Sequence, residues 1–105
     1  MTGGSVASDD DAIMARFVRD YLAMLDHRVS TITTELESGT DLNAHVALLS
    51  LESASTMVGA TELAKLVGLL RSEVERGQRS HVVGLVQAIT AEAARLPGRL
   101  DPAKT

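Results

Sequence analysis

The sequence predicts an all-α protein, an antiparallel up-and-down four-helix bundle. Apolar residues recur at steps of three or four along the chain, and glycines interrupt that period at Gly39, Gly59 and Gly77. Both prolines, Pro97 and Pro102, lie beyond the last helical pattern. The three- or four-residue period is that of amphipathic helices, and no strand-like alternation competes with it. Because the connections are short, neighbouring helices are expected to be antiparallel, and a chain of 105 residues can bury such a core.

The first helix is expected to begin at Ser8 or Asp9, after a disordered leader over residues 1–8 that is rich in Gly and Ser. The acidic residues that follow favour its positive end. It is expected to end at Ser38-Gly39, where glycine can take the left-handed conformation. The positions predicted to face the core are Met14, Val18, Tyr21, Leu25, Val29, Ile32 and Leu36.

The second helix is expected to run from a cap at Thr40 or Asp41 to about Val58, and the third from about Thr61 to Arg76. Gly59 and Gly77 end these two helices. The predicted inward positions are Ala44, Leu48, Leu51, Ser55 and Val58 in the second helix, and Leu63, Leu66, Val67, Leu70 and Val74 in the third.

The fourth helix is expected to begin at Ser80 and to stop at Pro97-Gly98. The bundle therefore spans residues 9–97, and residues 98–105 form a polar tail. The predicted inward positions of the fourth helix are Val82, Val83, Val86, Ile89, Ala93 and Leu96.

Composition excludes several functions. The net charge is −4 and aromatic residues make up 2% of the chain, so there is no basic stripe or stacking platform for nucleic acid. There is no cysteine, which removes thiol nucleophiles, thiolate metal sites and disulfides. The small, acidic N-terminus is no secretory signal, and no apolar run is long enough for a transmembrane helix. We therefore expect a soluble, cytoplasmic protein without a cofactor or a membrane partner.

The second helix carries an unusual outward side. Leu49 lies about 130° around the helix from the centre of the inward stripe, and Leu42 and Val46 share its side. Three interpretations of this row are open. Loop or tail residues cover it, or its members are scattered surface apolar residues without significance. Alternatively, the row is a docking patch for another protein. The candidate partner-binding residues are Leu42, His45, Val46, Leu49, Glu52, Ser53 and Thr56.

The segment over residues 48–60 resembles the signature of histidine-containing phosphotransfer (HPt) domains, Ala-His-x-Leu-Lys-Gly-Ser-(Ser/Ala)-x-x-(apolar)-Gly-Ala. The resemblance extends over about residues 13–96. It implies a four-helix bundle and a partner that is a response-regulator receiver domain or a histidine kinase. The matching positions are Leu51, Ala54 or Ser55, Val58, Gly59, Ala60, Leu63 and Ala64.

The chain departs from the resemblance where the family has its chemistry. Leu49 replaces the histidine that accepts phosphate, and an aliphatic side chain has no lone pair to offer. Glu52 replaces a lysine and would repel a phosphoryl group. Ser53 replaces a glycine and is still small. These changes predict a degenerate HPt-like module without catalysis at the standard site, which retains a docking surface for its partner.

Two alternatives remain open. His45, one turn before Leu49, could accept phosphate itself, or it could be a half-exposed histidine paired with Asp41. The chain could instead be an unrelated bundle that forms a homodimer through its outward row. His27 and His81 have no recognisable activating partner and are expected on the surface, and the three histidines lack metal-site spacing.

One acidic pair belongs among the ordinary surface features. Glu73 and Glu75 lie in the third predicted helix and are expected to be on a solvated face. Neither carboxylate has a sequence context that marks it as catalytic or metal-binding.

Overall fold

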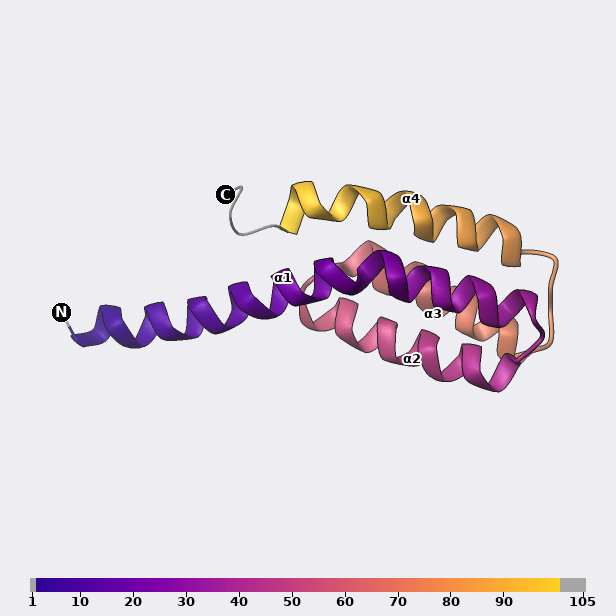
Figure 1. Ribbon diagram of the computed structural model, residues 1–105, viewed down its shortest axis with the longest axis horizontal. Coiled ribbons are helices and arrows are strands. Elements are labelled where there is room, and N and C mark those ends of the chain that lie inside the picture. Colours follow the sequence, from indigo (N-terminus) through magenta and orange to yellow (C-terminus); the bar gives the residue numbers. More distant parts are fainter. Residues whose placement is uncertain (1, 101–105) are drawn as a thin grey trace.

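Four α-helices make up the chain between residues 2 and 100 of the computed structural model, and side chains are described from residue 11 onward. Met1 and residues 101–105 lie outside the described part, which contains no strand. The all-α, four-helix prediction is therefore confirmed (Figure 1). The helices are α1 (Thr2–Glu37), α2 (Asp41–Met57), α3 (Thr61–Glu75) and α4 (Val82–Leu100).

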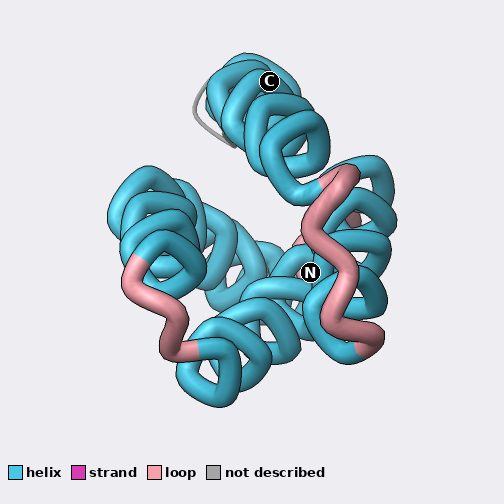
Figure 2. Tube along the Cα trace, turned by 90° about the vertical axis from the view of Figure 1, so that its right-hand side faces the viewer, coloured by secondary structure: helices cyan, strands magenta, loops and turns pink. Residues whose placement is uncertain are grey.

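Each helix packs against two others. The main contacts join α1 to α2 and α4, and α3 to α2 and α4, with the most extensive contact between α2 and α3. The connections after α1 and α3 lie at one end of the bundle, and the connection after α2 lies at the other end (Figure 1). Seen end-on, the four helices surround one core (Figure 2). Helix α2 therefore has one buried side and one side that no other helix covers.

Helix α1 begins earlier than the sequence predicts. Its first residue is Thr2, whereas the expected start is Ser8 or Asp9. A helix that is already nucleated lengthens by one hydrogen bond for each residue added, so extension costs little. The N-terminal part of α1 projects past the end of the bundle where α2 and α3 are connected (Figure 1). The side chains of the predicted leader, residues 1–8, lie outside the described part.

The three helix ends at glycine are confirmed. Gly39, Gly59 and Gly77 have positive φ angles of 80°, 82° and 70°, which is the conformation that closes a helix with a Schellman motif. At the first of these turns the Thr40 amide donates to the Glu35 carbonyl at 3.0 Å. The Thr40 hydroxyl turns back to the same carbonyl at 3.1 Å and does not cap α2, as the sequence had suggested.

The predicted end of the fourth helix is wrong. Helix α4 continues through Pro97 and Gly98 to Leu100, so residues 98–100 do not belong to a tail. Arg99 Nη1 donates to Glu92 Oε2 at 2.8 Å, a contact that spans two turns across the proline. Leu100 packs partly buried against the core. These two contacts hold the last turn, although Pro97 removes one backbone donor.

The predicted core is largely confirmed, with two corrections. Met14 is 51% exposed because it lies before Val18, the first residue that the bundle buries among the described side chains of α1. Val83 is 69% exposed because it is rotated about 100° from its neighbour Val82, so only one of the two can face inward. Leu66, Val82 and Val86 are partly buried against the core.

A buried hydrogen bond ties α1 to α2. The hydroxyl groups of Tyr21 and Ser55 form a hydrogen bond of 2.7 Å inside the core. Burial raises the pKa of Tyr21. We expect Tyr21→Phe to lower the free energy of unfolding by about 1–2 kcal/mol, because the Ser55 hydroxyl would lose its partner. Urea denaturation followed by circular dichroism measures this. The double variant Tyr21→Phe/Ser55→Ala is the control and should recover part of the loss; an unchanged midpoint in Tyr21→Phe would contradict the prediction.

Candidate functional site

The outer side of α2 is fixed by the residues that α2 buries. Ala44, Leu48, Leu51 and Ser55 are fully buried and Val58 is nearly so, as the sequence predicted. The opposite side therefore faces solvent over the whole helix. Leu42 is 77% exposed, Val46 59% and Leu49 47%. Within the described part of the chain, neither a loop nor a neighbouring helix covers this row.

Two further exposed residues extend the row. Met57 is 66% exposed and lies four residues after Ser53, which is also exposed. The sequence analysis missed Met57, although the helical spacing from Leu49 and Ser53 reveals it. We call these five positions the α2 stripe: Leu42, Val46, Leu49, Ser53 and Met57.

The outer half of α2 carries no charged side chain. The two acidic residues of the helix, Asp41 and Glu52, are each bound by an arginine. Arg79 Nη2 donates to Asp41 Oδ1 at 2.7 Å, and Arg71 Nε donates to Glu52 Oε1 at 2.7 Å. Depletion of charge with retention of large apolar side chains is the composition of an interface core. The α2 stripe is therefore an exposed face that is largely apolar and carries no charge.

Glu52 differs from its predicted role. The sequence suggested a carboxylate that would repel phosphate, but its side chain is half-buried between α2 and α3 and its charge is offset by Arg71. The hydrogen bond to Glu52 raises the pKa of Arg71, which also donates to Glu75 Oε1 at 3.2 Å. A Cβ atom on Gly68 would lie 2.9 Å from Glu52 Oε2. Gly68 therefore makes room for this carboxylate.

The predicted site residues separate into three groups. The structure brings Leu42, Val46, Leu49 and Ser53 together on the open face. His45 and Glu52 lie half-buried at its edge. Thr56 is exposed and donates its hydroxyl to the Glu52 carbonyl at 2.9 Å.

The predicted partnership of His45 with Asp41 is not found. Asp41 is bound by Arg79 instead, a contact between residues 38 positions apart that no local pattern indicates. No hydrogen bond to the His45 ring is found among the described side chains. Among the described residues, therefore, no carboxylate orients the His45 ring.

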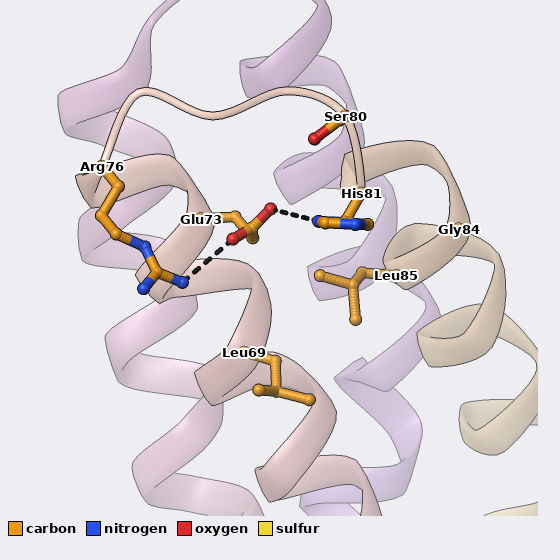
Figure 3. A pocket seen from close by; sticks show the side chains of 7 residues that line it. All are labelled: Leu69, Glu73, Arg76, Ser80, His81, Gly84 and Leu85. Carbon is orange, nitrogen blue, oxygen red and sulfur yellow. Dashed lines mark hydrogen bonds and ion pairs between the residues drawn. The ribbon is translucent and has the colours of Figure 1, made fainter.

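A second feature lies between α3 and α4, where a pocket of about 450 Å³ is lined by Leu69, Glu73, Arg76, Ser80, His81, Gly84 and Leu85 (Figure 3). Glu73 is buried, which corrects the expectation of a solvated face. Its Oε1 bonds His81 Nδ1 at 2.9 Å and its Oε2 accepts from Arg76 Nη2 at 3.0 Å. His81 therefore has a partner that the sequence analysis did not find. The spacing of three residues between Glu73 and Arg76 was an available signal for the Arg76 contact alone.

The Glu73 carboxylate should make stability dependent on acid. The hydrogen bond from His81, followed by the bond from Arg76, lowers the pKa of Glu73 below its ordinary value of 4.5. A lowered carboxyl pKa stabilises the fold above the unfolded-state pKa, and this contribution is lost as the pH falls through the folded-state pKa. We expect the melting temperature of the native chain to fall below about pH 4.5, and the fall to be smaller in Glu73→Gln. Glu62→Gln, at an exposed site, is the control; equal acid dependence in the native chain and Glu73→Gln would contradict this.

Comparison of the chain with protein-family models, with curated proteins and with solved structures finds no match in any of the three. Within the described residues, no group of three or more His, Asp or Glu side chains is placed to hold a metal ion. None of the described helices combines the length and apolar character that crossing a membrane requires. The function of the α2 stripe is therefore inferred from the exposure, charge and contacts of its own residues.

Proposed function

We propose that this chain is an HPt-like signalling module of a two-component phosphorelay that binds a receiver domain or a histidine kinase through the α2 stripe and does not transfer phosphate there. The observation that carries the proposal is Leu49. It is 47% exposed at the centre of an uncharged helix face, at the position where the sequence resemblance places the reactive histidine. An exposed leucine in place of a nucleophile favours binding over catalysis.

The surroundings of Leu49 suit a flat protein partner. Leu42 and Val46 extend the apolar surface toward the start of α2, and Ser53 keeps the next turn small. The flanking carboxylate of Glu52 is held against α3 by Arg71, so it does not project into the face. A partner can therefore approach the helix closely and bury apolar area without leaving a charge unpaired.

The same surroundings lack the parts that phosphoryl transfer needs. No atom of Leu49 can attack phosphorus, and the position of the favourable lysine holds Glu52. Arg71 already donates hydrogen bonds to Glu52 and Glu75, so its positive charge is paired with these carboxylates. A module of this kind would act in the cytoplasm by occupying a receiver and competing with active relay proteins for it.

Isothermal titration calorimetry against receiver domains encoded near this chain tests the proposal. We expect saturable one-to-one binding to at least one receiver, with no phosphoryl group transferred from the phosphorylated receiver. No binding to any receiver or kinase of the same organism would contradict the proposal. Acid-labile label on the chain that is lost in His45→Gln would favour the alternative, an active phosphotransferase that uses His45.

A further inference from the structure

A hollow between α1 and α2 is lined by hydrogen-bond donors and by no carboxylate. It has a volume of about 290 Å³, and its lining side chains are Met24, His27, Arg28, Thr31, Ala47 and Ser50. We infer that this α1–α2 hollow binds a small phosphate-bearing anion, either inorganic phosphate or a phosphate monoester, with the Arg28 guanidinium as the opposite charge. The inference rests on the lining of the hollow alone and goes beyond the proposed function.

Arg28 supplies a half-buried positive charge. The arginines that follow residue 70 are all paired with carboxylates, namely Arg71, Arg76, Arg79, Arg95 and Arg99. Arg28 differs from them, because no carboxylate among the described side chains forms an ion pair with it. A guanidinium presents a fork of N–H donors that matches two phosphate oxygens, and such charge-assisted bonds are short and strong. Arg28 is therefore placed to bind an anion from solution.

Three further donors line the same hollow. The His27 imidazole carries at least one N–H in either protonation state, and the Thr31 and Ser50 hydroxyls can each donate one hydrogen bond. Threonine hydroxyls elsewhere in the bundle are engaged, since Thr33 and Thr90 donate to the carbonyl four residues earlier. Within the described part, neither Thr31 nor Ser50 makes a side-chain hydrogen bond. Both hydroxyls are therefore available to phosphate oxygens.

The carboxylates near these residues in sequence lie elsewhere. Asp26 lines a separate hollow between α1 and α4, and Glu52 is held against α3 by Arg71. Asp20 lines an adjoining hollow and is not bonded to Arg28. An anion in the α1–α2 hollow therefore meets a positive charge and no negative charge in the lining.

The number of donors and the size of the hollow favour a phosphate group. Four donor groups from two helices suit the three terminal oxygens of a phosphate monoester, which accept several hydrogen bonds at once. A carboxylate has two oxygens and leaves part of this set unused. A hollow of about 290 Å³ holds a phosphate together with several water molecules, since each water takes about 30 Å³ in the liquid.

The adjoining hollow offers room for an ester substituent. It has a volume of about 230 Å³, and Phe17, Met24 and Ala54 contribute apolar surface to it. Arg28 and Met24 line both hollows, so the two form one groove along α1 and α2. A monoester with a short apolar or aromatic substituent can therefore place its phosphate beside Arg28 and its substituent beside Phe17.

Exposed side chains on the rim make the binding weak. His27 and Ser50 are exposed, and salt screens the charges that water reaches. We therefore expect a dissociation constant in the millimolar range that rises with ionic strength.

Titration of the ¹⁵N-labelled full chain, followed by amide chemical-shift changes at fixed pH and ionic strength, tests the site. The probes are inorganic phosphate, phenyl phosphate and acetate, and sodium chloride replaces the probe in the reference series. For the two phosphate probes we expect saturable changes around Arg28, Thr31 and Ser50. Acetate should bind at least about tenfold more weakly.

Substitution of Arg28 identifies the site of binding. Arg28→Gln should weaken phosphate binding at least about tenfold, because it removes the guanidinium. Arg19→Gln is the matched control, because it removes the same charge from α1 at an exposed residue outside the lining; it should bind phosphate like the native chain. Ser50→Ala changes no charge and should weaken binding about threefold. Thermal melting of each variant confirms that the bundle is folded.

Three results would overturn the inference. Changes that do not saturate, or that the chloride series reproduces, indicate an adventitious ion only. Equal phosphate affinity in Arg28→Gln and the native chain would place the anion elsewhere, and equal affinity for acetate would remove the assignment to phosphate. Tighter binding of phenyl phosphate than of inorganic phosphate would identify the ligand as a monoester, and the reverse order would identify it as the free ion.

The two proposals fail separately. A chain that binds phosphate with the predicted dependence on Arg28 but binds no receiver would contradict the proposed function alone. A chain that binds a receiver but shows no saturable binding of phosphate would overturn the anion site alone.

Discussion

Replacement of Leu49 by Asp is expected to weaken binding of a receiver domain by about a hundredfold, which is the size of effect seen at the apolar centre of an interface. Leu49 is at the middle of the α2 stripe, and a carboxylate there would be buried without a partner in the complex. The free energy of unfolding of the free chain should change by less than about 0.5 kcal/mol, because the side chain is outside the core. Calorimetric titration measures the first quantity and urea denaturation the second.

A matched substitution on another helix supports the interpretation of Leu49→Asp. Leu69 is 54% exposed, a value close to that of Leu49, but it lies on α3 beside the α3–α4 pocket. Leu69→Asp should leave receiver affinity unchanged. Two results would contradict the assignment of the docking face: an equal loss of affinity in both variants, or unfolding of the Leu49→Asp chain.

The second large effect is expected one residue earlier. Leu48 is fully buried, and Leu48→Ala should lower the free energy of unfolding by about 3 kcal/mol, within the range of about 2–5 kcal/mol for truncation of a buried leucine. Leu49→Ala has the same chemistry at an exposed position and should cost less than about 0.5 kcal/mol. Urea denaturation of the two variants measures the difference. Similar losses of unfolding free energy in both variants would show that the buried and exposed sides of α2 are misassigned.

Much of the helical architecture was predictable because it depends on local signals. The glycines that end α1, α2 and α3 adopt the left-handed conformation at Gly39, Gly59 and Gly77. The inward positions of α2 follow from a period of three or four residues, and the exposure of Leu49 follows from the same period. The open face of α2 was therefore predictable from the sequence alone.

The charged contacts between helices or between a helix and a connection were not predictable, because no local spacing indicates them. The Glu52–Arg71 bond spans 19 residues. Glu73 and His81 meet only because the connection after α3 folds back over the end of that helix (Figure 3). A carboxylate in an amphipathic pattern is ordinarily solvated, so its burial is recognised only when its donors are placed around it.

The predicted end of α4 was wrong for a related reason. Proline ordinarily ends a helical pattern, and the sequence gives no sign that Arg99 would reach back to Glu92. The contact at 2.8 Å and the packing of Leu100 offset the missing donor of Pro97. Local rules were overridden here by contacts within the folded bundle.

The most direct test of a docking face on α2 is a ¹⁵N-labelled chain titrated with an unlabelled receiver domain and followed by amide chemical-shift changes. A dilute sample keeps self-association from contributing to the shifts. Our account predicts the largest changes on the exposed side of α2 around Val46, Leu49 and Ser53. Changes centred instead on the α3–α4 pocket around His81, or the absence of changes with every receiver, would contradict it.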